Sequence, residues 1–282
     1  VMTYRKLYRE IVSKLERSGC ESPAFDAGCL LEHFTGVSRG ILPVRGDEKL
    51  DADICRTVLD ATEQRATGRP LQYIIGTWGF MSLTIQVGEG VLIPRPETEL
   101  LCEKTAELLT GVNNPRVLDL CAGSGCVGLG IASLCTDASV TAVELSEQAQ
   151  FFLKKNIECY PDLNVKAFKA DVLKDAPMFD DKYYNAIAAN PPYIKNSDIP
   201  HLMCEVRHEP VMALDGGDGF IFYRAIIRNW LRKLVPGGIC AVEVGLGQAA
   251  EVADMFKNAG LYNVEIFRDI AGIERVVTGC VK

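Results

Sequence analysis

The four residues Asn190-Pro191-Pro192-Tyr193 have side chains and carbonyls that could hold a planar amino group. An NH2 conjugated to a carbonyl or a heteroaromatic ring is a poor nucleophile, because its lone pair is delocalised. The side-chain oxygen of Asn190 and the carbonyl of Pro191 could each accept one of its hydrogens, while Tyr193 packs on its flat face. Such acceptors would favour a transition state in which the nitrogen gains positive charge. The same residues could also serve only to end a strand.

A glycine-rich turn provides a second candidate site. Its backbone could approach a ligand closely, and the helix after it would offer free N–H groups. With Gly128 the turn matches the G-x-G-x-x-G pattern, and Glu144 lies where a ribose-binding acid is expected. A nicotinamide-dependent oxidoreductase is therefore an open alternative. The turn consists of Cys121, Ala122, Gly123, Ser124 and Gly125.

Three acids distinguish between these possible ligands. Asp119, Glu144 and Asp171 each end, or directly follow, one of three successive predicted strands. A carboxylate at Asp119 would repel a pyrophosphate, but it could orient the turn or face a positively charged ligand. S-adenosylmethionine carries a sulfonium and an ammonium group and no phosphate. The three acids therefore favour a methyl donor over a dinucleotide.

The elements that must position these residues alternate between strands and helices. This alternation predicts an α/β fold with a mostly parallel sheet and right-handed crossovers. The carboxyl ends of parallel strands meet at one edge, where open sheets of this class bind ligands. The predicted strands are 116–120, 139–144, 165–170, 184–189 and 239–244, followed by β-rich runs at 264–267 and 275–277.

The amino-terminal part of the chain has a different character. Residues 1–72 show helical spacing of apolar residues and no catalytic constellation, so we expect a small all-helical docking domain. Residues 73–92 are expected to form a β-hairpin linker, with strands at 73–76 and 80–87. The α/β domain would then span residues 93–282. Its first segment, 91–99, bends at two prolines and could either begin the domain or wall an active site.

Composition limits the possible classes of protein. The 282 residues carry a formal charge of −7, which argues against binding of nucleic acid through bulk electrostatics. Eleven cysteines and three histidines show no Cys-x-x-Cys and no clustering at ligand spacing, so we expect no metal site. Scattered cysteines favour a reducing compartment. No apolar run is long enough to span a bilayer and there is no signal-peptide pattern, so we expect a cytoplasmic protein.

Taken together, these motifs resemble those of the PrmC/HemK family of protein-(glutamine-N5) methyltransferases. The resemblance covers nearly the whole chain, and the combination of the Ile-Pro-Arg-Pro-Glu-Thr run with Asn-Pro-Pro-Tyr-Ile is its most specific part. The matching residues are Asp26-Ala27, Leu30-Leu31, Pro70-Leu71-Gln72-Tyr73, Gly76, 92–99, 119–125, 190–194, Glu209-Pro210 and Ala213-Leu214.

The resemblance implies a fold and a reaction. The fold would be a seven-stranded, Rossmann-like, S-adenosylmethionine-dependent methyltransferase sheet with a reversed final hairpin. The enzyme would methylate the side-chain amide of the glutamine in the Gly-Gly-Gln motif of peptide chain release factors, leaving S-adenosylhomocysteine. The helical domain would dock the release factor, and we expect a monomer with no membrane or direct nucleic-acid partner.

The resemblance also implies roles for individual residues. The glycine turn from Cys121 to Gly125, with Asp119 before it, would bind the methionine part of the donor. Glu144 would bind the ribose, and Asp171 with Val172 the adenine, while Asn190 would touch donor and substrate. The family usually has glycine at 121, often aspartate at 144 and often an aromatic residue at 172. Asn190, Pro191 and Tyr193 would be catalytic, with Pro192 completing the glutamine site.

Two further alternatives remain at this point. An amino-group methyltransferase acting on adenine or cytosine in nucleic acid would use the same Asn-Pro-Pro-Tyr arrangement on a flipped base. A non-catalytic binding protein could keep the fold without the activity. The intact turn and loop favour catalysis, and the acidic net charge favours a protein substrate.

Overall fold

The computed structural model describes residues 2–282 and divides into two compact units. The helical unit comprises the chain up to Thr77 together with Met203–His208. The sheet unit comprises Trp78–Leu202 and Glu209–Lys282. The chain thus leaves the sheet unit shortly after the Asn190–Tyr193 loop and returns to it at Glu209.

The helical unit is built on three amphipathic helices, as the periodicity predicts. Thr3 caps the first helix and Asp51 the third, each accepting a backbone N–H through its side chain. The buried faces meet in a core that includes Leu7, Ile11, Leu30 and Val58. The helices are α1 (Tyr4–Arg17), α2 (Pro23–Thr35), α3 (Ala52–Ala66) and the short α4 (Leu71–Ile75).

The strand predicted at 73–76 is wrong, because residues Leu71–Ile75 form α4. Pro70 precedes the helix, and Gly76 ends it in the left-handed conformation (φ 82°) with its N–H donated to the Gln72 carbonyl. Leu71 and Tyr73 are buried. The hairpin itself begins later, with β1 (Thr77–Phe80) and β2 (Leu83–Gln86).

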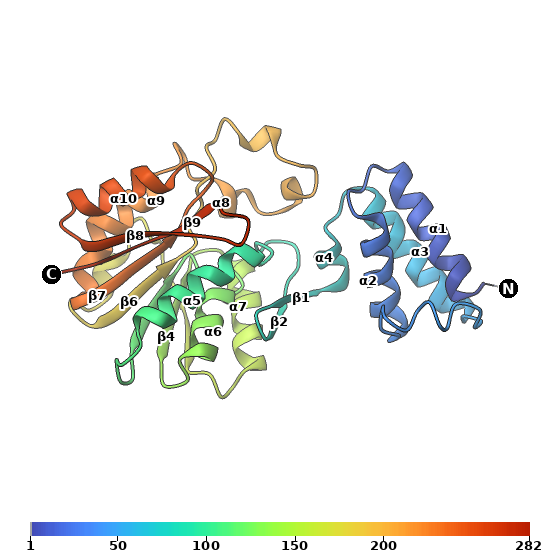
Figure 1. Cartoon of the computed structure of the whole chain (residues 1–282), viewed down its shortest axis with the longest axis horizontal. Helices are drawn as coiled ribbons and strands as arrows, with labels where there is room; N and C mark the ends of the chain where they lie inside the picture. Colours follow the sequence, from blue (N-terminus) through green and yellow to red (C-terminus); the bar gives the residue numbers. More distant parts are fainter. Residues whose placement is uncertain (1) are drawn as a thin grey trace. The chain divides into compact units, whose positions relative to one another are not determined.

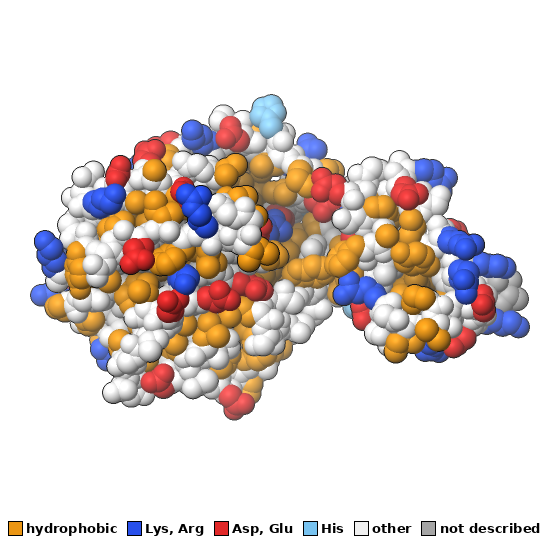
Figure 2. Space-filling view, viewed as in Figure 1, with side chains coloured by type: hydrophobic (Ala, Val, Ile, Leu, Met, Phe, Trp, Pro, Cys, Tyr) orange, Lys and Arg blue, Asp and Glu red, His pale blue; other side chains and the backbone are white. Residues whose placement is uncertain are grey.

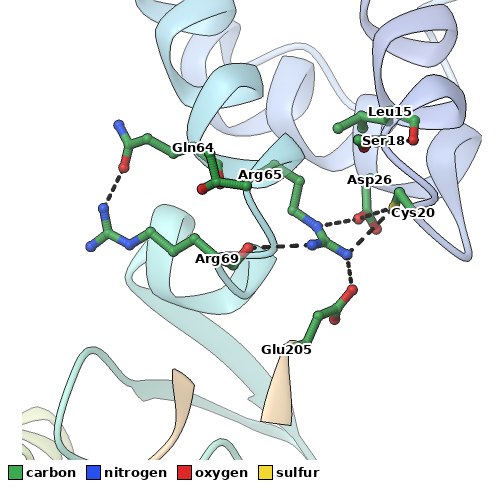
Figure 3. A network of polar contacts seen from close by, with 9 residues as sticks. Leu15, Ser18, Cys20, Asp26, Gln64, Arg65, Arg69 and Glu205 are labelled. Atoms are coloured by element: carbon green, nitrogen blue, oxygen red, sulfur yellow. Dashed lines mark hydrogen bonds and ion pairs between the residues drawn. The ribbon is translucent and has the colours of Figure 1, made fainter. Parts of the chain in front are cut away.

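A buried arginine organises the polar interior of the helical unit (Figure 3). Arg65 is only 5% exposed, and its Nε donates to Asp26 Oδ2 at 2.6 Å. Its Nη2 is paired with Glu205, which comes from the Met203–His208 segment. Because both carboxylates share one guanidinium, Arg65 connects α2, α3 and this returning segment.

The sheet unit contains the predicted seven-stranded sheet, in the order β5-β4-β3-β6-β7-β9-β8. Strands β3 to β7 pair in parallel, whereas β9 is antiparallel to both β7 and β8. This arrangement confirms the reversed final hairpin. The strands are β3 (Arg116–Leu120), β4 (Ser139–Glu144), β5 (Val165–Lys169), β6 (Tyr184–Ala189), β7 (Leu234–Glu243), β8 (Tyr262–Arg268) and β9 (Glu274–Cys280).

Helices cover both faces of this sheet (Figure 1). The central strands are therefore buried on both sides, which explains their nearly continuous apolar sequences. On one face lie α5 (Glu99–Leu108), α6 (Cys126–Leu134) and α7 (Glu147–Cys159), and on the other α9 (Ile221–Ala225) and α10 (Ala249–Asn258). The short helices η1 (Pro96–Thr98) and α8 (Val211–Leu214) lie in the connecting loops.

The helix expected at 220–234 is regular only over α9. A π-helical turn follows at Ile226–Trp230 and a 3₁₀ turn at Leu231–Lys233. Trp230 is fully buried in this irregular part, and its Nε1 donates to the Val172 carbonyl at 2.8 Å. The wide turn therefore lets the indole reach the loop after β5.

None of the helices among residues 2–282 combines the length and the apolar character that a membrane span requires.

Replacement of Arg65 should destabilise the protein strongly. In Arg65→Met the apolar stem is kept, but Asp26 remains buried without its cation, which typically costs about 3–5 kcal/mol. Urea unfolding measures the loss. Arg56→Met is the matched control, since Arg56 pairs with Asp53 on the surface of α3 and the two side chains are mostly exposed. Equal effects of the two substitutions would contradict the assignment.

Candidate functional site

A cavity of about 420 Å³ opens at the carboxyl edge of the sheet. Its volume falls in the range of roughly 300–1,000 Å³ that is typical of small-ligand sites. The register explains why it gathers the predicted residues, because Leu120 of β3 pairs with both Val143 of β4 and Ala189 of β6. The predicted residues that line it are Cys121, Ala122, Gly123, Ser124, Glu144, Asp171, Val172, Asn190 and Pro192. Asp119, Gly125, Pro191 and Tyr193 are outside this lining set.

The glycine turn folds back tightly between β3 and α6. Gly125 has a φ of 84°, and an added Cβ would lie 2.5 Å from Cδ1 of Leu153. Only glycine therefore fits at this position. Cys121 also has a left-handed backbone, with a φ of 61°, although it carries a side chain. The cysteine thus stores backbone strain at the start of the turn.

The side chain of Asp119 contacts the first turn of α6, which follows the glycine turn. Its carboxyl group is fully buried, and Oδ2 accepts the Gly128 N–H of α6 at 2.8 Å. Oδ1 has no hydrogen-bond partner among the described residues. Burial raises the pKa of Asp119 to about 8, and the nearby Glu144 adds to the rise. Two roles were expected for Asp119, orienting the turn or facing a charged ligand; the structure shows its hydrogen bond to α6 and leaves it outside the cavity lining.

Glu144 fastens the turn to the end of β4. Its Oε2 accepts the Gly123 N–H at 2.8 Å, and its Oε1 accepts the Ser146 N–H at 2.7 Å. Burial raises the pKa of Glu144, and these backbone hydrogen bonds oppose the rise. A carboxylate has about four acceptor positions, so two remain for ligand hydroxyls.

The segment after β5 forms an apolar wall with an acid at its start. Asp171 accepts the Leu173 N–H at 2.9 Å and pairs with Lys174 at 2.9 Å. Val172 is buried, and its carbonyl is held by Trp230. The aliphatic Val172 side chain thus lies on the cavity wall in a fixed place.

Asn190 has a defined orientation at the end of β6. Its Nδ2 donates to the Thr98 hydroxyl oxygen at 3.2 Å. The amide therefore keeps its Oδ1 acceptor for other partners. Thr98 is almost fully buried, and both residues line the cavity.

The rest of the Asn190–Tyr193 loop is held by close backbone packing. Ile194 exchanges backbone hydrogen bonds with Leu214 and Gly216 at 3.0 and 2.8 Å. A Cβ on Gly216 would lie 2.7 Å from the Pro192 carbonyl oxygen, so the loop fits only against glycine. Gln248 Nε2 donates to the Tyr193 carbonyl at 3.0 Å. The loop backbone is thereby packed against Gly216 and hydrogen-bonded to Gln248.

The proline bend at 91–99 is part of the cavity wall. Arg95 and Thr98 line the cavity, as do residues 91–94. Arg95 is ion-paired with the buried Glu209, whose Oε2 accepts the Ile93 N–H at 3.0 Å. The structure thus decides between the two interpretations of this bend in favour of a site wall.

The charges around the cavity suit a cationic ligand. Glu144, Asp171 and Asp215 line it, and the single lining cation, Arg95, is neutralised by Glu209. A pyrophosphate would find no unpaired cation among these lining residues, whereas a sulfonium with an ammonium group suits the acids. On the face shown in Figure 2, basic side chains of the sheet unit lie singly among acidic and apolar ones.

Comparison with known proteins now identifies the family. The PrmC N-terminal domain family matches residues 6–76, and the family described as conserved hypothetical protein 95 matches residues 72–225. Release factor glutamine methyltransferase from Thermodesulfovibrio yellowstonii is 38% identical, over 81% of this chain and 82% of that protein. Its counterpart from Deinococcus radiodurans is 35% identical over 98% of both chains. The chain belongs to the release factor glutamine methyltransferase family.

Family membership confirms the resemblance inferred from the motifs and makes the protein a methyltransferase. Among solved structures, it is similar to the hMettl16 catalytic domain in complex with MAT2A 3'UTR hairpin 6, with a TM-score of 0.56. That likeness covers 81% of this chain and 82% of the other at 17% identity, and shows the fold alone.

Several residues in or next to this cavity were missed by sequence reasoning. Thr98 lies within the 92–99 motif, and its place in that motif could have identified it. Gly216, Trp230 and Gln248 gave no such signal, because their roles depend on tertiary contacts.

Relief of the strain at Cys121 should stabilise the protein. Glycine adopts the left-handed conformation without the steric cost of a side chain, so we expect Cys121→Gly to gain up to about 1 kcal/mol. Cys121→Ala removes the same thiol but keeps the strain, and it is the control. Chemical denaturation of both variants checks this, and a gain in the alanine variant equal to that of glycine would refute it.

The buried Asp119 predicts a pH-dependent stability. Its folded-state pKa of about 8 lies above its ordinary value, so between about pH 4 and 8 the folded state retains a proton that the unfolded state loses. Stability should therefore fall as pH rises through this window. Asp119→Asn keeps an acceptor for Gly128 and should melt above wild type at pH 9, with a smaller difference at pH 6.

Thermal melts without ligand measure this effect, with the exposed Asp162→Asn as control. A constant difference between Asp119→Asn and wild type from pH 6 to pH 9 would contradict the account.

Proposed function

We propose that this protein transfers a methyl group from S-adenosylmethionine to the side-chain amide nitrogen of a glutamine. The substrate is the glutamine of the Gly-Gly-Gln motif of peptide chain release factors, and the second product is S-adenosylhomocysteine. Membership in the release factor glutamine methyltransferase family supports the substrate. The single observation that carries the chemistry is the hydrogen bond from Asn190 Nδ2 to Thr98, because it leaves the Asn190 oxygen free to accept from an amide.

The donor would lie along the turn and the ends of β4 and β5. The backbone of Cys121–Gly125, oriented by Asp119, would hold its methionine part. Glu144 would accept hydrogen bonds from the ribose hydroxyls, and Asp171 with Val172 would hold the adenine. When bound, the donor supplies a methyl group made electrophilic by its sulfonium sulfur.

The substrate amide would be held by the loop after β6. Asn190 Oδ1 and the Pro191 carbonyl would each accept one of its hydrogens, while Pro192 and Tyr193 confine its plane. These acceptors stabilise the positive charge that develops on the attacking nitrogen. No strong base is needed before attack, because the nitrogen becomes acidic once it gains the methyl group. Catalysis would come from positioning and hydrogen bonding.

The proposal extends to the organisation of the chain. Residues 1–72 would dock the release factor, 73–92 would form the linker, and 93–282 would carry the reaction. We infer a monomer that acts in the cytoplasm on a protein substrate, with no membrane or nucleic-acid partner.

Substitution of Asn190 tests the assigned chemistry. Asn190→Ala should lower turnover by about 10²–10³, the usual cost of losing a group that stabilises transition-state charge. Donor affinity should change by less than about threefold, because the donor is held mainly by the turn and its acids. Titration calorimetry and steady-state assays separate the two effects. Equal losses in both would count against this role.

The substrate is tested with labelled S-adenosylmethionine and three acceptors: an unmodified release factor, the same factor with its Gly-Gly-Gln glutamine replaced, and duplex DNA. We expect label on the first acceptor only. Label on DNA would move the function to base methylation in the same site. Donor binding with no label on any acceptor would indicate a binding protein.

A further inference from the structure

One face of α7 is paired with the segment 84–90, which leads from β2 to the cavity wall (Figure 1). The Tyr160 hydroxyl accepts the Thr84 N–H at 2.6 Å and donates to the Thr84 carbonyl at 3.0 Å. Asn156, which lies one helical turn earlier, pairs in the same way with both backbone groups of Gln86. Side chains of the helix thus take the place that a neighbouring strand would have beside β2.

The pairing continues in the same register up to the cavity. Two residues of extended chain advance by about 6.6 Å and four residues of a helix by about 6 Å, so alternate residues of the segment meet every fourth residue of α7. Beyond β2 the segment lies so close to the helix that an added Cβ would come within 2.6 and 2.7 Å of its side chains. These contacts join Gly88 to Phe152 and Gly90 to Gln148.

Asn156 also reaches the glycine turn. Its Nδ2 donates to the Ser124 carbonyl at 2.9 Å and to the Gln86 carbonyl at 3.0 Å, while its Oδ1 accepts the Gln86 N–H at 2.7 Å. The side chain is fully buried, and both amide hydrogens and the oxygen have partners. A backbone N–H can only donate and a carbonyl can only accept, so these partners fix the orientation of the amide.

This one amide therefore joins two parts of the chain that line the cavity. Ser124 belongs to the glycine turn, and the segment 84–90 continues directly into the lining residues 90–95. Leu153, three residues before Asn156, packs against the same turn, where it leaves no room for a Cβ on Gly125. The turn is thus held by two neighbouring positions on one face of α7, of which only Asn156 is polar.

We propose that Asn156 is a positioning residue for methyl transfer, which holds the Ser124 carbonyl and thereby keeps the glycine turn in the shape that binds the donor. Asn156 is outside the cavity lining, so it acts through the turn and touches neither the donor nor the reacting atoms. The inference deepens the proposed function and rests on it, because the proposed function assigns the turn to the methionine part of S-adenosylmethionine.

Substitution of Asn156 by leucine tests this role. Asn156→Leu keeps the branched shape but leaves the buried Ser124 carbonyl without its donor, so the free turn should leave its binding shape. We expect Kd for S-adenosylhomocysteine, measured by titration calorimetry, and KM for the donor to rise at least tenfold. At saturating donor, kcat and KM for the release factor should change less than threefold. A variant that was merely less stable would instead lose active protein, with both donor constants unchanged.

Tyr160→Phe is the matched control, because it removes both hydrogen bonds to Thr84 on the same face of α7 but none to the turn. Its donor Kd should change less than threefold. Asn156→Asp decides the test if the leucine variant does not fold. It keeps an acceptor for the Gln86 N–H, but a carboxylate cannot donate to Ser124, so it should lose donor affinity as leucine does. Equal donor affinities of the Asn156 variants and Tyr160→Phe would overturn the inference.

Hydrogen exchange in wild type provides a readout that needs neither a variant nor turnover. Coupling between two sites is reciprocal, so if Asn156 favours donor binding, the bound donor must favour the Asn156 hydrogen bonds. NMR should show that S-adenosylhomocysteine slows exchange of the Asn156 side-chain amide, and unchanged exchange would refute the inference. Because this ligand is used without an acceptor, the two proposals can fail separately. If wild type methylates the release factor but exchange is unchanged, only the inference fails. If wild type labels no acceptor, the proposed function fails, and exchange still decides the role of Asn156.

Discussion

The hydrogen bond between Asn190 and Thr98 is the constraint on which the proposed chemistry depends. An asparagine amide has a donor end and an acceptor end of nearly equal size, so only its partners decide which end faces a ligand. Here the partner comes from the proline bend at 91–99, which is far from β6 in sequence. Residues of the bend and of the Asn-Pro-Pro-Tyr loop therefore line one cavity, although each motif is unspecific alone.

The carboxyl edge of the parallel sheet brings the other half of the site together. Because β3, β4, β5 and β6 run parallel, the residues that follow them emerge side by side at one edge. The acids Glu144 and Asp119 at these strand ends have different hydrogen-bond partners. Glu144 holds the turn through backbone N–H groups, whereas Asp119 supports α6 from the interior. Burying Asp119 lowers stability at high pH. The cavity beside the turn has three acids, Glu144, Asp171 and Asp215, among its mostly apolar lining residues.

The alternation of apolar strands and helices was enough to predict a mostly parallel sheet and the edge at which the cavity lies, whereas the seven strands were implied by the resemblance to the PrmC/HemK family. The strand at 73–76 was mispredicted because a short apolar run fits a strand or a buried helix equally well. Pro70 precedes the helix at this position, and Gly76 ends it in the left-handed conformation. The hydrogen bond between Asn190 and Thr98 could not be predicted, because it depends on how the proline bend packs against the end of β6. Asp119 was expected either to orient the turn or to face a charged ligand, and its burial and its hydrogen bond to Gly128 of α6 depend on tertiary packing that the sequence does not reveal.

The most direct test is a crystal structure of the protein with S-adenosylhomocysteine and a peptide containing Gly-Gly-Gln. The account predicts the glutamine amide nitrogen within hydrogen-bond distance of Asn190 Oδ1 and the Pro191 carbonyl, with Asn190 Nδ2 still bonded to Thr98. A glutamine bound away from this loop would contradict it. So would an Asn190 amide that turns its nitrogen toward the substrate.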